Sequence, residues 1–294
     1  MPAVGFIGFG EAGSTIARGL RAAGVGQLFA YDINTEDSAL GPVIHARARD
    51  AGTALVASPA ELAQSSAILL STVTSSSALD AARQNAPGLS NGHMYADLNS
   101  VSPALKQEIE RVITAAGALF VEVAVMAPVK PYGHQVPLLL GGAGARAFAD
   151  LMRPFGMRMD VLDGTRVGGA AAVKMCRSIV VKGLEALLFE CVLGASRFEA
   201  DELVWASLGE SFPGIDWKAL ADYTAGRVVV HGERRAREME EVAETLRAVG
   251  VDPIMADATA RRQDWSARKD LRSRFGPEGP KTYREVLDVL DHFG

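Results

Sequence analysis

The strongest constraint on this chain is a short apolar segment that runs directly into three regularly spaced glycines. Residues 4–7 read Val-Gly-Phe-Ile, and Gly8-Phe9-Gly10-Glu11-Ala12-Gly13 follow at once. Glycines at this spacing permit a tight strand-to-helix turn, close approach of the backbone to a pyrophosphate, and close packing of the next helix. Because an ordinary strand–turn–helix can carry the same spacing, the motif needs support from its surroundings.

The segment that follows the glycines supplies this support. A helix predicted over 11–23 would direct its N-terminal amides and the positive end of its dipole at the phosphates. A second apolar run, 27–31, then ends in Asp32. An acidic residue about twenty positions after the glycines is the usual partner of an adenosine ribose. Together these features predict a dinucleotide-binding βαβ unit.

Asp32 also bears on the choice of cofactor. Its carboxylate would accept hydrogen bonds from a ribose diol and repel a 2′-phosphate, which favours NAD over NADP. Arg47 and Arg49 follow in the sequence and could reach the same pocket. NADP therefore remains possible.

Composition excludes several other classes of protein. The chain has 294 residues, which suggests two domains, and its net charge of −5 disfavours a nucleic-acid or membrane surface. No secretory signal or membrane-spanning run is apparent, and a cytoplasmic location is expected. Cys176 and Cys191 lack metal-ligand spacing, so we expect buried free thiols and no metal site.

Short apolar runs alternate with helical segments up to residue 164. This alternation predicts a Rossmann-type, mainly parallel α/β sheet domain over 1–164, with ligands beyond the carboxyl ends of the strands. Ser102-Pro103 is a typical N-cap and first helical residue. The expected strands cover 67–73, 93–98 and 118–125, and the expected helices cover 76–85, 102–116 and 143–155.

The pattern changes after residue 164. A long helix is predicted over 167–195, apolar almost all round and therefore buried on several sides. A further helix is expected over 233–249, rich in Arg and Glu. We expect a long connecting helix and an all-helical substrate and dimerisation domain over 165–294.

The long helix carries a polar stripe that could be functional. At the helical spacing Lys174, Ser178 and Glu185 share one face, with Arg177 and Lys182 beside it. Lys174 could pack its stem and extend its ammonium to solvent or a carboxylate. Alternatively it faces a cleft, with a pKa lowered by desolvation and cationic neighbours, and exchanges protons.

The order of motifs resembles that of the β-hydroxyacid dehydrogenase superfamily, which includes 3-hydroxyisobutyrate and 6-phosphogluconate dehydrogenases. The resemblance rests on the glycine motif and on Asp97-Leu98-Asn99-Ser100-Val101-Ser102-Pro103, similar to the family's region beside the nicotinamide. It rests also on the loop after the 120–125 strand and on Gly168-x5-Lys174-x3-Ser178. The resemblance implies a hydride transfer between NAD(P) and a small hydroxy acid, a 3-hydroxy acid being favoured, with Lys174 as general acid and base.

Two departures from the family pattern stand at the expected substrate site. Met126 aligns with a serine that orients substrate, and Ser178 aligns with an asparagine. The sequence around both positions resembles a branch of this superfamily that has a distinctive phosphogluconate-dehydrogenase-like C-terminal domain. Retention of Lys174 argues against the imine-reductase branch. The departures leave open an inactive NAD(H)-binding sensor, or a dehydrogenase of an amino- or phospho-substituted acid.

The resemblance and the motifs together give a set of candidate site residues. Tyr132, His134 and Lys130 could bind a carboxylate or hydroxyl, although each could also belong to a solvated loop. His231 and Arg234, placed at the opening of a later helix, could anchor an anion, either within one chain or across a homodimer of the kind relatives form. The full set is as follows: catalytic, Lys174 and Ser178; cofactor-binding, Gly8, Gly10, Glu11, Ala12, Gly13, Asp32, Thr72, Val73, Asn99 and Ser100; binding a small carboxylate substrate, Met126, Lys130, Tyr132, His134, Arg177 and His231.

Overall fold

The chain folds into two compact units. The computed structural model describes residues 3–164, 166–276 and 278–291. The units are Met1–Lys174 and Met175–Gly294, and the division between them falls within the long helix. Within the described residues, no helix combines the length and apolar character needed to cross a membrane.

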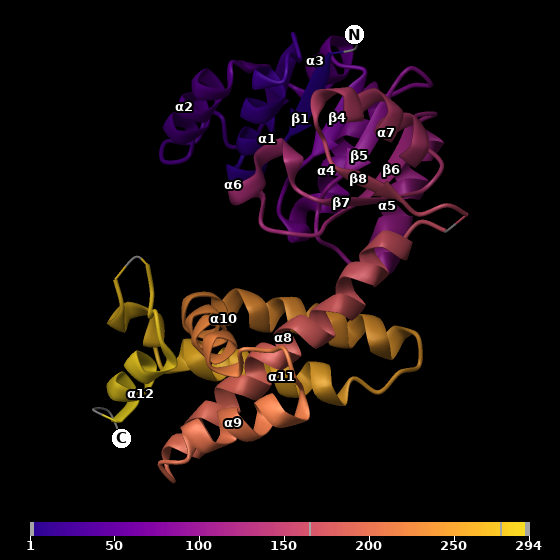
Figure 1. Ribbon diagram of the computed structural model, residues 1–294. Helices are drawn as coiled ribbons and strands as arrows, with labels where there is room; N and C mark the ends of the chain where they lie inside the picture. The colour runs from indigo at the N-terminus through magenta and orange to yellow at the C-terminus, as the bar shows by residue number, and fades with distance from the viewer. Residues whose placement is uncertain (1–2, 165, 277, 292–294) are drawn as a thin grey trace. The chain divides into compact units, whose positions relative to one another are not determined.

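The first unit is built on an eight-stranded sheet with the strand order β3-β2-β1-β4-β5-β6-β7-β8. β7 pairs antiparallel with β6, and every other neighbouring pair is parallel. The predicted Rossmann-type α/β class is therefore confirmed (Figure 1). The strands are β1 (Val4–Ile7), β2 (Leu28–Tyr31), β3 (Ala54–Leu55), β4 (Ile68–Ser71), β5 (Met94–Asp97), β6 (Leu119–Val125), β7 (Leu138–Gly141) and β8 (Met159–Val161).

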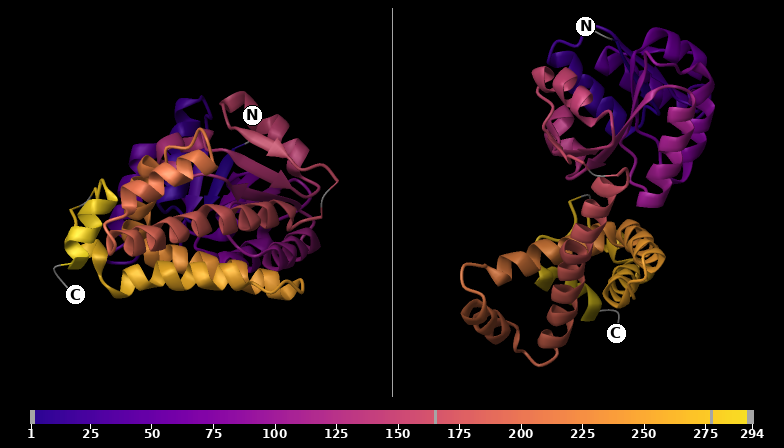
Figure 2. Two further views of the ribbon diagram at one scale, coloured as in Figure 1. Left: turned by 60° about the horizontal axis from the view of Figure 1, so that its bottom comes forward. Right: turned by 90° about the vertical axis from the view of Figure 1, so that its right-hand side faces the viewer.

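Helices cover both faces of this sheet (Figure 2). The strand side chains alternate between two cores, so that Phe6 and Leu70 belong to one cluster and Ile7 and Leu69 to the other. One core includes side chains of α1, α2 and α7, and the other includes those of α3, α4 and α5. The helices are α1 (Glu11–Ala22), α2 (Gly41–Ala51), α3 (Pro59–Ser65), α4 (Ala78–Asn85), α5 (Pro103–Ala115), α6 (Val129–Tyr132) and α7 (Ala145–Met152).

The strand register brings several predicted site segments to one edge of the sheet. Ile7 at the end of β1 is paired with Ser71 of β4, and Ser71 with Asp97 of β5. The chain order reverses at β1, which has β2 on one side and β4 on the other. A crevice at such a reversal is where sheets of this kind bind ligands.

The second unit is helical. Its buried core includes Phe189, Trp205 and Tyr283, whose rings come from three different helices, and α10 packs along α11. The helices are α8 (Gly169–Ser196), which begins in the first unit, α9 (Asp201–Ser211), α10 (Trp217–Ala248), α11 (Ile254–Arg268) and α12 (Tyr283–Asp291).

One expectation about the helices is wrong. The helix expected over 233–249 begins at Trp217, where the Asp216 side chain accepts a hydrogen bond from the Ala219 amide, so His231 and Arg234 lie in the middle of α10. The long helix has one exposed stripe, on which Val180 and Leu187 are 70% and 62% exposed.

The cysteines also differ from expectation. Both are free thiols, as predicted, but Cys176 is exposed and Cys191 is half-buried. Cys176 lies on the outward stripe of α8 that carries Val180 and Leu187, which explains its exposure. Burial raises the pKa of the Cys191 thiol.

Candidate functional site

The three glycines after β1 have different surroundings. Gly8 has a φ of +79°, and a Cβ there would meet the Val73 side chain at 2.7 Å. A Cβ on Gly13 would lie 2.5 Å from Thr72 Oγ1, whereas a Cβ on Gly10 would meet nothing within 4 Å. Gly8 thus makes the turn, Gly13 allows α1 to pack closely, and Gly10 leaves open space at the helix start.

The N-terminus of α1 can receive an anion. Gly10 is the N-cap residue and provides no side chain to bind the first amides, which belong to Glu11 and Ala12. Such amides carry a partial positive charge and point out of the helix end. The open space at Gly10 adjoins these donors, so the residues present fit a pyrophosphate.

Asp32 is held firmly at the end of β2. Its Oδ2 accepts from the Phe9 amide at 2.7 Å, and its Oδ1 accepts from the Asn34 amide at 2.9 Å. The bond from Phe9 joins the carboxylate to the glycine loop, and the bond from Asn34 fixes it to the turn that follows. Each carboxylate oxygen retains further lone-pair capacity for a ribose hydroxyl.

The loop after β4 closes against the glycine loop. Thr72 Oγ1 donates to the Gly8 carbonyl at 2.7 Å, and the Thr72 amide donates to the Ile7 carbonyl at 2.8 Å. Val73 lies against the same turn, since a Cβ added to Gly8 would meet Val73 Cγ1 at 2.7 Å. Thr72 and Val73 therefore lie beside the glycine loop, and cofactor binding by them stays a prediction.

Asn99 and Ser100 follow β5 at the same sheet edge. The side-chain nitrogen of Asn99, Nδ2, donates to Ser71 Oγ at 2.9 Å. The side-chain oxygen of Asn99, Oδ1, is buried and has no hydrogen-bond partner among the described residues. Lys174 Nζ donates to Ser100 Oγ at 2.5 Å. This bond brings together two predicted site residues that are 74 positions apart in the sequence.

A buried ion pair beneath this loop was not predicted. Lys106 on α5 and Asp97 at the end of β5 are at most 1% exposed, and Lys106 Nζ lies 2.8 Å from Asp97 Oδ2. The same ammonium donates to the Asp97 carbonyl at 2.7 Å. A pair so buried fixes the geometry of the segment that leads to Asn99. In the sequence, this pair is indicated only by a lysine, Lys106, on a helix face that is otherwise apolar.

Glu122 caps α8. It lies in β6 with no exposed surface, and its two oxygens accept from the Gly168 and Ala171 amides, each at 2.8 Å. A carboxylate at a helix N-terminus satisfies free amides and complements the dipole. Lys174 lies less than one turn beyond Ala171, so this cap fixes the position of Lys174 on the helix.

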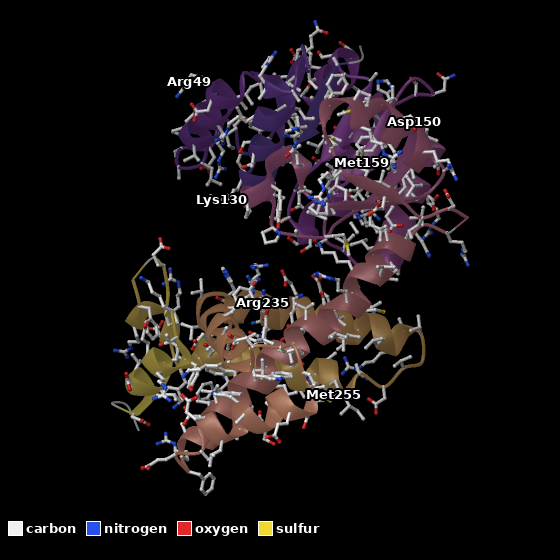
Figure 3. All side chains as sticks on the ribbon, in the orientation of Figure 1. Arg49, Lys130, Asp150, Met159, Arg235 and Met255 are labelled. Carbon is white, nitrogen blue, oxygen red and sulfur yellow. The ribbon has the colours of Figure 1, made fainter. Side chains whose placement is uncertain are left out.

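The residues of the substrate loop predicted after β6 have different surroundings. Lys130 Nζ lies 3.9 Å from Glu11 Oε1 at the start of α1, and Tyr132 is 46% exposed. The Met126 amide donates to the Pro137 carbonyl at 2.9 Å. Lys130 is thus placed near the glycine loop (Figure 3).

His134 packs inward instead of projecting from this loop. A Cβ added to Gly19 of α1 would lie 2.1 Å from its Nδ1, and one added to Gly156 would lie 3.2 Å from its Nε2. Burial lowers the pKa of His134. This geometry explains two glycines and favours a packing role, and substrate binding by His134 stays a prediction.

The remaining predicted residues lie in the helical unit. Ser178 Oγ accepts from Lys182 Nζ at 3.3 Å, Arg177 is exposed, and His231 is half-buried on α10. Burial and the charges of Arg234 and its neighbours lower the pKa of His231.

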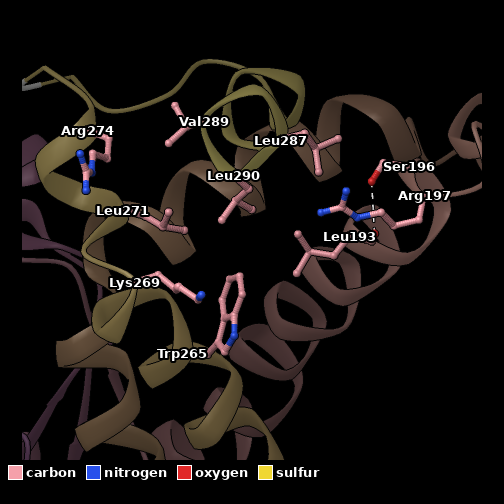
Figure 4. A pocket seen from close by; sticks show the side chains of 10 residues that line it. All are labelled: Leu193, Ser196, Arg197, Trp265, Lys269, Leu271, Arg274, Leu287, Val289 and Leu290. Atoms are coloured by element: carbon pink, nitrogen blue, oxygen red, sulfur yellow. Dashed lines mark hydrogen bonds between the residues drawn. The ribbon is translucent and has the colours of Figure 1, made fainter. Parts of the chain in front are cut away.

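A cavity of about 310 Å³ lies at the far end of α8, and none of the predicted site residues lines it. Leucine side chains and the Trp265 ring form its walls, and Arg197, Lys269 and Arg274 lie at its edge (Figure 4). The predicted site is therefore distinct from this cavity.

Comparison with known proteins agrees with this division of the chain. Residues 3–152 match the family described as the NAD binding domain of 6-phosphogluconate dehydrogenase, and residues 195–266 match a domain of unknown function. A conserved hypothetical protein from Sinorhizobium meliloti has a similar structure, with 38% identity and a TM-score of 0.79, over 90% of this chain and 88% of that protein.

Two further relatives carry information about activity. A conserved protein of unknown function, described as structurally similar to 3-hydroxyacid dehydrogenases, is 31% identical over 92% of this chain and 98% of its own, with a TM-score of 0.77. The mitochondrial 3-hydroxyisobutyrate dehydrogenase of Drosophila melanogaster is 26% identical over 73% of this chain and 64% of that enzyme.

Proposed function

Because this chain belongs to the family built on the NAD binding domain of 6-phosphogluconate dehydrogenase, we propose that it is an NAD(P)-dependent oxidoreductase acting on a small hydroxy acid. A 3-hydroxy acid is the favoured substrate, in line with the activity named for the Drosophila relative. The observation that carries the proposal is the contact of Lys174 Nζ with Ser100 Oγ, at 2.5 Å. It places the one lysine of the helix motif beside a loop at the carboxyl edge of a dinucleotide-binding sheet.

The first unit supplies the groups that would hold the cofactor. Open space at Gly10 and the amides of Glu11 and Ala12 suit the pyrophosphate, and Asp32 suits the adenosine ribose. The carboxylate favours NAD over NADP. When bound, the nicotinamide accepts or supplies the hydride.

Lys174 would handle the proton in this reaction. In oxidation the neutral amine takes the proton of the substrate hydroxyl, and in reduction the ammonium protonates the developing alkoxide. Ser100 Oγ orients the lysine side chain for both directions. General acid–base catalysis of this kind is worth about 10²–10⁴-fold in rate.

The test is nicotinamide absorbance with 3-hydroxy acids, 2-hydroxy acids and their oxo counterparts, each with NAD(H) and NADP(H). Lys174→Ala should lower turnover by about 10²–10⁴-fold while NADH affinity stays nearly unchanged. Lys218→Ala, which removes an exposed lysine of the helical unit, is the matched control and should retain full activity. Equal turnover in Lys174→Ala would remove this lysine from the mechanism.

One observation favours a different class of function, an NAD(H) sensor. Met126 and Ser178 stand where the family resemblance implies a serine and an asparagine that hold substrate. A protein that binds NADH but converts no member of a broad panel would support the sensor.

We also propose that the helical unit pairs with a second copy of the chain in the cytoplasm. Four large apolar side chains of this unit are exposed: Val180 by 70%, Leu187 by 62%, Phe198 by 83% and Leu203 by 74%. Large apolar side chains gathered on one unit are typical of a protein interface.

A further inference from the structure

The cavity at the end of α8 belongs to the helical unit alone. The ten residues that line it come from the end of α8, the end of α11, the short 3₁₀ helix η5 (Leu271–Arg274) and α12, and all of them lie in the second unit. Its volume of about 310 Å³ falls at the lower end of the range of small-molecule sites, which is about 300–1,000 Å³. The proposed reaction uses none of these residues.

The walls of this cavity are apolar, and part of them is firmly held. Leu271 is buried, and the Trp265 ring packs edge-on against Phe189 with the ring centroids 6.1 Å apart. The guanidinium of Arg262 lies 5.5 Å from the centroid of the same indole ring. These contacts hold the indole in one orientation. The apolar wall residues are Leu193, Trp265, Leu271, Leu287, Val289 and Leu290.

An unusual turn brings a cation and a buried leucine to the same cavity. Asp270 has a φ of +48°, a left-handed conformation that few residues other than glycine adopt. Ser273 Oγ donates to the Asp270 carbonyl at 2.9 Å and to its Oδ2 at 2.6 Å, which holds the turn. The residues on either side of Asp270, Lys269 and Leu271, both line the cavity. Backbone in such a conformation persists only where neighbouring contacts fix it, and it is common at ligand sites.

The polar groups at the edge of the cavity are mainly cationic. Arg197, Lys269 and Arg274 line it, and no carboxylate is among the described lining residues. Arg197 Nη1 is paired with Asp291 Oδ1 at 2.9 Å, whereas none of the ion pairs between described residues includes Lys269. Figure 4 shows the Lys269 ammonium directed into the cavity beside the Trp265 ring. An apolar space with a cation at its edge is complementary to an apolar molecule that carries one anionic group.

We propose that this cavity binds an amphipathic carboxylate, with its hydrocarbon chain among the leucines and Trp265 and its carboxylate at Lys269. A cavity of about 150 Å³ with similar walls holds benzene, so the volume of about 310 Å³ suits a chain of roughly six to twelve carbon atoms. A small hydroxy acid has too little apolar surface to fill this space. The inference therefore goes beyond the proposed function and does not depend on it.

The test is a calorimetric titration of the full-length protein with octanoate, at constant ionic strength and below the concentration at which octanoate forms micelles. 1-Octanol, which lacks the charge, and acetate, which lacks the chain, are the comparison ligands. We expect one saturable site for octanoate, about tenfold weaker binding of 1-octanol, and no measurable binding of acetate. Absence of a saturable octanoate site would overturn the proposal.

Chain length separates a cavity from an exposed apolar surface. Each buried CH₂ group should increase the affinity about fourfold from hexanoate upward, until the cavity is full and longer chains gain nothing. An affinity that continues to rise beyond dodecanoate would indicate adsorption to exposed apolar surface and would contradict the site.

Variants test the two halves of the site separately. Lys269→Met should weaken octanoate binding about tenfold and leave 1-octanol binding unchanged. Lys218→Met removes an exposed lysine that pairs with Glu202 elsewhere in the helical unit, and should bind like the wild type. Leu290→Gln should weaken both ligands equally, and circular dichroism melting shows that each variant is folded. Equal weakening by the two lysine variants would mean general charge attraction and no built site.

A second copy of the chain could fill the same cavity instead, and light scattering across the octanoate titration distinguishes the two occupants. Octanoate bound in a cavity open to solvent leaves the mass of the protein unchanged. A fall in mass as octanoate binds would assign the cavity to an interface between copies and overturn the proposed site. Neither cofactor nor turnover enters these measurements, so failure of the proposed oxidoreductase activity would leave their outcome intact.

Discussion

At the scale of single residues, the three glycines of the motif after β1 have three separate roles. Gly8 adopts a φ of +79°, Gly13 is in close contact with Thr72 and the Gly8 carbonyl, and Gly10 faces open space. The motif therefore combines requirements of folding and of binding. Substitution by alanine can distinguish the folding requirement from the binding requirement, because the added methyl group disturbs only what occupies the space at that position.

We expect Gly13→Ala to destabilise the protein and Gly10→Ala to impair binding instead. The added Cβ at Gly13 would lie 2.5 Å from Thr72 Oγ1, and overpacking of this kind costs about 1–3 kcal/mol. At Gly10 the φ of −71° suits alanine, so stability should hold while NADH affinity falls about tenfold, because the methyl group occupies space meant for phosphate. Urea unfolding and NADH titration of both variants check this. Normal NADH binding by Gly10→Ala would contradict the assignment of the phosphate site.

At the scale of elements, the N-terminus of α8 depends on one carboxylate from β6. Glu122 accepts from two amides of the helix start, and no water-exposed surface remains on it. Glu122→Gln keeps the shape but replaces one acceptor oxygen by a donor and removes the negative charge. We expect a loss of about 1–3 kcal/mol in the free energy of unfolding, measured in urea at neutral pH.

Glu110 on α5 provides the control for this variant. Burial and the charge of Glu122 raise the pKa of Glu110. A carboxyl whose pKa is raised by folding is less stable when ionised in the folded state, so its charge opposes folding at neutral pH. Glu110→Gln should accordingly leave stability equal or higher. A loss equal to that of Glu122→Gln would show that the cap is not the cause.

How far the elements could be predicted depended on their apolar content. β1, β4, β5 and β6 are runs of buried residues and were located to within a few residues. β7 and β8 were missed, because β7 is a short run after a loop and β8 has only three residues, with an exposed Asp160 at its centre. The first half of α10 was missed although Asp216 is a recognisable N-cap.

The site could be predicted only where a local motif marks it. The glycine loop, Asp32 and Lys174 follow from spacing and from the family resemblance. The Lys106–Asp97 pair and the Glu185–Arg235 pair depend on packing, and Glu185 and Arg235 are 50 residues apart in the sequence. No periodicity within one element can show which charged side chains on two elements will meet.

At the scale of the whole molecule, the exposed stripe of α8 needs an explanation that the single chain does not contain. Val180 and Leu187 are seven residues apart, so they lie on one helix face, and both are largely exposed. A second copy covering this face would remove their apolar surface from water. The excess of exposed apolar side chains on the helical unit supports the same assembly.

The expected outcome is a dimer in which Leu187 lies at the interface. Leu187→Glu would bury a charge there, at a cost of about 3 kcal/mol or more, and should weaken the dimer at least about 100-fold. Val43→Glu introduces the same charge at an exposed apolar position on α2 of the sheet unit, and should leave the assembly unchanged. Light scattering coupled to size-exclusion chromatography measures the mass of each variant. A monomeric wild type, or a Leu187→Glu variant that remains dimeric at the same concentration, would mean that this stripe serves another purpose.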